Sequence, residues 1–247
     1  MAYLHTSRCA QAVLATAGFT LVLSLALSMS GCVNSTIEQV KQPGIAFDNA
    51  DSIVILARRH ENASETEASF TECVEERLSE ESTHLKVHPQ KAFVDAMFPW
   101  FEPGTAPVTT DAIPKLLANP GVRSQIEQTG VRYVVWLDGS TQRIDSGGTM
   151  SCAISPAGGG CLGFGWWEDA ADYEATIWDL RTASTTGMVS ADVSGTSYMP
   201  ALVVPIPLIA RTQAAACKGL AKQLSQFLRT LTTAKDKRLR KLVKLLV

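Results

Sequence analysis

The alternation of hydrophobic and polar positions predicts short strands in the first 140 residues of the chain. Residues 52–57 form an apolar, β-branched run, and residues 131–139 are apolar almost throughout, as in strands that are covered on both faces. Residues 84–89 alternate between polar and apolar, which is typical of a half-buried strand. We therefore expect a strand at each of these places.

Helical periodicity fills the segments between these strands. Residues 64–82 place an apolar stripe on one helix face, and Ser64 with Glu67 fits a capping box at its start. A short helix is expected over 89–98, and two helical pieces over 109–130. In the latter, Thr110 caps the first piece, Asn119 begins the second with a proline after it, and Gly130 ends it.

The second half of the chain is rich in β-strand signals and closes with a helix. Strands are expected near 149–155, 161–168, 172–181 and 186–195, with turns of Gly, Ser, Asp and Thr between them. Residues 200–210 are apolar but hold three prolines, so we expect an extended edge or a loop lying across the sheet. A long helix is expected over 211–231, with its buried stripe formed by Cys217, Leu220, Ala221, Leu224, Phe227, Leu228 and Leu231.

This order of elements predicts the fold class α+β, or α/β with a mixed sheet. Helices flank a set of strands, a β-meander follows, and a helix closes the domain. Over residues 52–231 the element order and the terminal helix resemble the amino-terminal domain of the periplasmic protein TolB. They also resemble envelope lipoproteins of that architecture, such as penicillin-binding-protein activators and the curli secretion lipoprotein. This resemblance implies a binding or assembly module.

The first residues have the pattern of a secretory signal peptide. Arg8 supplies a positive charge, an apolar core follows over 12–27, and small residues lead to Cys32. The alternative is a transmembrane helix, but the core lies at the short end of the roughly 17–25 residues that span a bilayer, and no basic cluster follows it.

The stretch from Met29 to Cys32, "MSGC", resembles the bacterial lipobox. The resemblance implies that Cys32 receives a diacylglycerol and that residues 1–31 are removed. Val33 follows the cysteine where retention at the inner membrane would need Asp, so the resemblance favours the outer membrane, with the domain facing the periplasm. The alternative is an ordinary cysteine near a cleaved terminus. We expect a lipidated tether over 32–50, one globular domain over 51–231 and a tail over 232–247.

Four further cysteines fit an exported protein. Cys73, Cys152, Cys161 and Cys217 allow three pairings, and four free thiols are the alternative. Cys152 and Cys161 enclose a short loop whose proline and glycines let it turn back, so we expect a disulfide there. Cys73 and Cys217 would then form the second disulfide, joining two predicted helices.

Composition and motifs narrow the function classes further. The formal net charge of −2 argues against nucleic acid as a partner, and no residue pattern indicates a cofactor, a metal site or catalytic residues. Trp100, Phe101, Trp166 and Trp167 lie beside turn residues and are candidate contacts for an envelope protein or peptidoglycan. Core packing under loops is the alternative for these aromatics.

Two functions remain open on the sequence. The first is a non-enzymatic, lipid-anchored envelope protein whose domain binds or assembles with envelope components. The second is a periplasmic hydrolase that acts on cell-wall or lipid material. Residues 234–247 carry six basic residues against one acid, and as a helix they would be amphipathic, so we expect them to contact an anionic lipid surface. A solvated extension of the last helix is the alternative for this tail.

Overall fold

The computed structural model describes residues 33–41, 51–57, 66–81, 86–102, 105–107, 112–156 and 158–246, without the side chains of Lys41 and of residues 230–246. The chain divides into two compact units. Unit 1 contains residues 145–168 and 195–210, and unit 2 contains residues 33–144, 169–194 and 211–247.

The structure is an α+β fold, as predicted, with a mixed six-stranded sheet in the order β1-β6-β5-β4-β2-β3. Strand β2 runs parallel to both β3 and β4. The strands are β1 (Val33–Lys41), β2 (Ser52–Ala57), β3 (Lys86–His88), β4 (Val131–Ser155), β5 (Gly158–Asp179) and β6 (Ser184–Pro205). The helices are α2 (Ala68–Glu81), α3 (Gln90–Ala96), α4 (Ala112–Leu117), α5 (Pro120–Thr129) and α6 (Thr212–Leu246).

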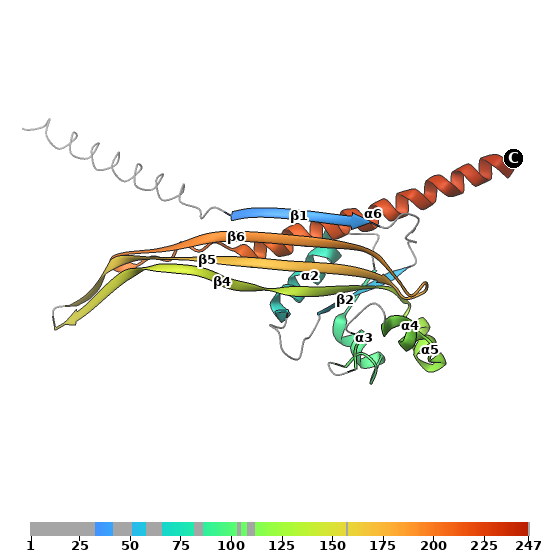
Figure 1. The fold of residues 1–247 in the computed structure, drawn as a ribbon, viewed down its shortest axis with the longest axis horizontal. Helices are drawn as coiled ribbons and strands as arrows, with labels where there is room; N and C mark the ends of the chain where they lie inside the picture. The colour runs from blue at the N-terminus through green and yellow to red at the C-terminus, as the bar shows by residue number, and fades with distance from the viewer. Residues whose placement is uncertain are drawn as a thin grey trace, which may run out of the picture. The chain divides into compact units, whose positions relative to one another are not determined.

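In unit 2 helices cover both faces of the sheet (Figure 1). Successive residues of a strand point to opposite faces, and β2 shows this directly. Ile53 and Ile55 pack in a core with α2 and α6, whereas Val54 and Leu56 pack in a second core with α3, α4 and α5. This two-sided burial explains why residues 131–137 of β4 are also apolar throughout most of their length.

The predicted helix ends in the middle of the chain are confirmed. The side chain of Asn119 accepts a hydrogen bond from the Gly121 amide at 2.9 Å, and Pro120 occupies the first turn of α5. Gly130 ends the helix in the left-handed conformation, with φ 70°. Ser64 and Thr110, the other predicted caps, lie outside the described residues.

The expected set of short strands is wrong, because β4, β5 and β6 are each more than 20 residues long. The glycines that suggested turns lie inside the strands instead. Gly148 has φ 115°, and a Cβ atom there would overlap the carbonyl oxygen of Phe164 on the neighbouring strand. Such glycines permit local irregularities in a continuous strand, so they do not end it.

The amino-terminal part of the expected tether also differs from the prediction. Val33–Lys41 forms strand β1 beside β6, and the partly buried Ile37 packs against the core formed with α6. The remaining tether residues, 42–50, lie outside the described residues, and Ser52 begins β2. The sequence predicts the last helix over 211–231, but α6 continues to Leu246.

Candidate interaction surface

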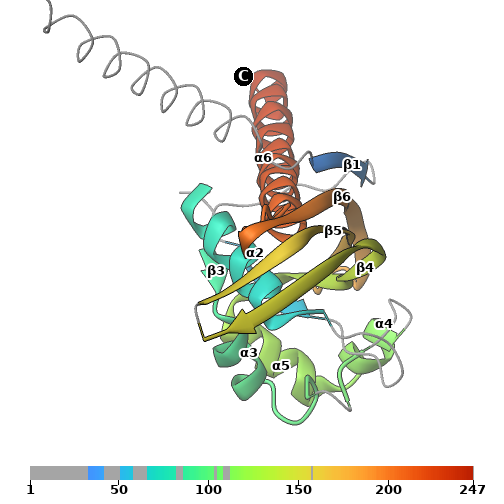
Figure 2. The same ribbon diagram turned by 90° about the vertical axis from the view of Figure 1, so that its left-hand side faces the viewer.

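The strand segments of unit 1 are free of charged side chains over a long stretch. We call residues 146–156, 158–167 and 195–210 the uncharged sheet, because they contain no Asp, Glu, Lys, Arg or His. Figure 2 shows the strand segments side by side, with β5 between β4 and β6. No described helix belongs to this unit.

Large apolar side chains are exposed on the uncharged sheet. Of the fourteen exposed large hydrophobic residues among those described, nine lie here, which concentrates them in a minor part of the chain. Ile154 is 94% exposed and Leu202 81% exposed. The nine are Ile154, Leu162, Phe164, Tyr198, Leu202, Val203, Val204, Ile206 and Ile209.

One face of the uncharged sheet gathers several of these residues. Leu162 and Phe164 are two residues apart on β5 and therefore lie on the same face. The ring of Phe164 lies 6.0 Å from the ring of Tyr198 on β6, so Tyr198 belongs to that face too. Contiguous apolar surface of this kind marks sites that a protein partner or a membrane covers.

The two long edges of the uncharged sheet differ. After β6 the chain folds back, and the amide of Leu208 donates to the carbonyl of Tyr198 at 2.7 Å. The amide of Ile206 donates to the carbonyl of Pro200 at 2.9 Å, which pairs the returning segment with β6. At the opposite edge, β2 pairs with β4 only as far as Leu137, so no described strand covers β4 within unit 1.

The predicted disulfide between Cys152 and Cys161 is confirmed and joins β4 to β5. Their Cα atoms lie 4.0 Å apart. Nearby, the indole of Trp166 packs over Gly147, where a Cβ atom would lie only 2.9 Å from the ring nitrogen. A side chain larger than hydrogen at Gly147 would displace this tryptophan.

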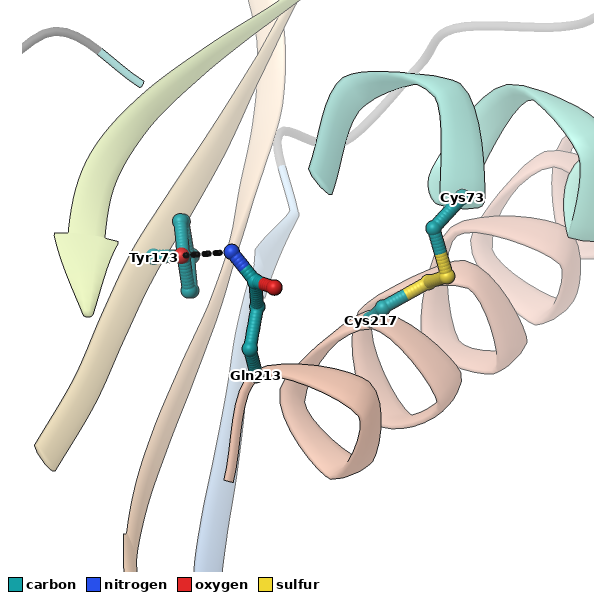
Figure 3. Close-up of a disulfide and its surroundings, with 4 residues drawn as sticks. All are labelled: Cys73, Tyr173, Gln213 and Cys217. Atoms are coloured by element: carbon teal, nitrogen blue, oxygen red, sulfur yellow. Dashed lines mark hydrogen bonds between the residues drawn. A yellow bond between two sulfur atoms is a disulfide. The ribbon is translucent and has the colours of Figure 1, made fainter. Parts of the chain in front are cut away.

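The second predicted disulfide, Cys73–Cys217, is also confirmed and joins α2 to α6 in unit 2 (Figure 3). Beside it, Gln213 of α6 donates a hydrogen bond to the hydroxyl of Tyr173 at 3.4 Å. That hydroxyl donates to Glu67 at 2.7 Å, and burial raises the pKa of Tyr173 to about 12. The tyrosine is therefore a neutral hydrogen-bonding group that ties β5 to the starts of two helices.

A pocket of about 640 Å³ lies in unit 2, where α5 ends and β4 begins. Arg123, Arg132 and Arg181 contribute to its lining. Arg132 donates to the buried carboxylate of Asp179 at 2.8 Å and to Asp51 at 2.6 Å. Burial alone would lower the pKa of Arg132, but these hydrogen bonds raise it, so the residue is a charged member of a compensated cluster. Arg132 therefore presents no uncompensated buried charge to a ligand.

The aromatic residues proposed from the sequence fall in different environments. Phe101 is 5% exposed and lies edge-on to Phe93, and Trp100 packs partly buried against the same core. Phe101 is therefore a core residue, which is the alternative to a role in partner contact. Trp166 and Trp167 are half-buried on β5 within the uncharged sheet.

Sequence reasoning missed the aliphatic residues that dominate the candidate surface. The prediction of an edge or loop over 200–210 gives Leu202, Val203 and Val204 no role in binding. The charge-free stretches 146–167 and 193–210 are the signal that could have identified this surface. Cys32, the predicted lipidation site, lies outside the described residues.

The described part of the chain contains neither a metal centre nor a membrane-spanning helix. Within it, His, Cys, Asp and Glu side chains form no group able to hold a metal ion. None of the described helices has the length and hydrophobicity that crossing a membrane requires.

Comparisons with known proteins show little. No protein-family model and no curated protein matches the chain. Among solved structures, it is similar to a single-residue variant of the PelC dodecamer from Paraburkholderia phytofirmans, with 13% identity, a TM-score of 0.36, and coverage of 79% of this chain and 99% of that one. The PelC dodecamer from the same organism gives 14% identity, a TM-score of 0.35, and coverage of 79% and 98%. A likeness at this level supports no conclusion about function.

Proposed function

We propose that the chain is a lipid-anchored envelope protein whose folded part is a binding and assembly module facing the periplasm of a bacterium. The observation that carries the binding role is the uncharged sheet, with nine exposed large hydrophobic residues and no charged side chain. Burying apolar surface contributes about 25 cal/mol per Å², so leaving such a surface in water is unfavourable compared with covering it.

The lipid anchor rests on the lipobox-like stretch that ends at Cys32. Metabolic labelling with a palmitate analogue tests this part. Wild-type protein should be labelled and fractionate with the outer membrane, and Cys32→Ala should lose the label. Persistent labelling of Cys32→Ala would show that the lipid is not on this residue.

Photo-crosslinking in intact cells tests the binding role. A photoreactive amino acid at Leu202, which is 81% exposed, should form an adduct with an envelope component. The same group at Ala214, an exposed position of α6, provides the control for proximity. If Leu202 gave no more adduct than Ala214, the uncharged sheet would not be a binding surface.

A further inference from the structure

We propose that the uncharged sheet pairs with a second copy of this chain, through the open edge of β4 at residues 146–155. The two β4 segments would run antiparallel across a twofold axis and join two uncharged sheets into one. This inference rests on the proposed function, because it names the partner that pairs with one edge of the binding surface.

Apart from the irregularity at Gly148, the β4 edge lacks the devices that protect sheet edges from pairing. Natural edges carry lysines, prolines or a covering segment. Residues 146–155 contain no charged residue and no proline, and nine of the ten are exposed. No described strand lies beside them on the side away from β5.

The disulfide shows which backbone groups face this open edge. Directly opposed residues of an antiparallel pair lie about 4.5 Å apart when they exchange no hydrogen bonds and about 5.5 Å apart when they do. The Cα separation of 4.0 Å between Cys152 and Cys161 shows that these two residues exchange no hydrogen bonds. The amide and carbonyl of Cys152 therefore face away from β5, and alternation gives Met150 and Ile154 the same orientation.

The opposite edge is blocked by prolines, which cannot donate backbone hydrogen bonds. In the segment that folds back on β6, the amides of Ile206 and Leu208 donate toward β6. The positions that alternate with them, and would donate outward, are Pro205 and Pro207, which have no N–H. The uncharged sheet thus has one edge able to accept a strand and one edge that proline blocks.

A second copy of the chain fits the open edge of β4 better than a lipid surface does. Pairing an edge with itself across a twofold axis places identical residues close together, so a charged edge would oppose its own charge. The β4 segment has no charge and avoids this repulsion. A lipid surface would bury the apolar side chains but leave the outward amides and carbonyls of β4 without partners, which is costly in hydrocarbon.

The test is co-purification of two differently tagged copies of the full chain, expressed together and extracted from the envelope in mild detergent. Outward-facing positions of one copy pair with outward-facing positions of the other, so an overlap of residues 147–155 centres the twofold axis on Ser151. The two Ser151 side chains then lie opposite each other on one face. Ser151 is exposed, so it can be replaced without disturbing the sheet itself. Ala214→Lys on α6 is the control for an added charge at an exposed position.

Wild-type copies should be recovered together, and Ala214→Lys should leave this recovery unchanged. Ser151→Lys in both copies should lower recovery of the second tag about tenfold or more, and so should Ser151→Glu in both, because like charges in a strand pair repel. One copy with Ser151→Lys and one with Ser151→Glu should restore it. Peptide mapping of the Cys152–Cys161 bond verifies that each variant is folded.

Three results would overturn the proposal: recovery of wild-type copies singly, continued pairing of folded Ser151→Lys copies, or failure of the mixed pair to restore recovery although both variants fold. If wild-type copies do not pair but a photoreactive group at Leu202 labels lipid or another protein, the second copy is wrong and the proposed function stands. If Leu202 labels nothing above the Ala214 control, the proposed function itself fails.

Discussion

At the scale of single residues, Arg132 is the centre of a cluster of ion pairs. It joins the fully buried Asp179 to Asp51, and the Asp179 carboxylate also accepts the amide of Arg181 at 2.8 Å. The cluster holds the start of β4 to the end of β5 in unit 2. Because it is compensated within the chain, we assign it to folding.

Replacing Arg132 with methionine should therefore destabilise unit 2. The change keeps much of the side-chain volume but leaves Asp179 buried without its cation, and we expect a loss of about 3 kcal/mol in the free energy of unfolding. Urea denaturation measures this. Arg181→Met is the control, since Arg181 is 68% exposed and its contact with Asp51 is 3.6 Å long. Equal, small effects of the two variants would show that the cluster contributes little.

Asp172 gives a prediction about pH. Partial burial and the neighbouring Asp192 raise its pKa above the ordinary value. The folded protein then binds a proton that the unfolded chain releases, so this residue favours folding below its unfolded pKa and loses that contribution as pH rises through its folded pKa.

Asp172→Asn should accordingly raise the melting temperature at pH 7 and have little effect near pH 3, below the unfolded pKa of about 3.9. Thermal unfolding followed by circular dichroism at both pH values measures the difference. Glu168→Asn changes a carboxylate elsewhere on β5 and serves as the comparison. A stabilisation that is the same at both pH values would exclude carboxylate repulsion as its cause.

At the scale of elements, the helices are easier to predict than the strands. Asn119, Pro120 and Gly130 mark the ends of α5 through backbone chemistry that is local in sequence. The strand ends are harder because Gly148 looks like a turn residue in sequence, whereas its positive φ accommodates an irregularity within β4. Only the pairing with the neighbouring strand β5 shows whether such a glycine forms a turn or lies inside a strand.

Long-range contacts also explain which features at the edges of the sheet escape prediction. β1 is polar along most of its length, and its place beside β6 depends on Ile37 packing against the core with α6. The open edge of β4 is equally hidden in the sequence, since it follows from where β2 stops pairing, at Leu137. The cysteine pairs were predictable because a short loop limited the choices.

The two disulfides should differ in their contribution to stability. Cys73 and Cys217 are 144 residues apart in sequence and Cys152 and Cys161 only 9. In the chain-entropy model the longer loop contributes about 5 kcal/mol and the shorter about 2.7 kcal/mol. Replacing each pair with alanines and measuring urea denaturation of the oxidised proteins compares them. A larger loss from the Cys152–Cys161 pair would contradict the model.

At the scale of the whole molecule, we propose a tethered protein with one covered surface and one basic end. Residues 234–246 continue α6, and residues 234–247 carry six basic side chains. Cations near an anionic bilayer contribute about 1 kcal/mol each, and salt screens them.

Removing residues 234–247 should leave folding intact and weaken binding to anionic vesicles. The comparison uses Cys32→Ala protein with and without these residues, so that no lipid anchor masks the effect. Flotation with phosphatidylglycerol vesicles should show less binding of the truncated protein at low salt and no difference at high salt. A large fall in melting temperature on truncation would instead place the leucines of the tail in the core.

Coverage of the uncharged sheet in the envelope can be measured by hydrogen exchange. Amide exchange over residues 146–155 would be followed by mass spectrometry in native outer-membrane vesicles and in dilute, detergent-extracted monomer. We expect slow exchange of this segment in the vesicles and fast exchange in the monomer, with the core helix segment 216–228 equally slow in both. Equally fast exchange of residues 146–155 in both samples would show that no strand pairs with the open edge of β4 in the envelope.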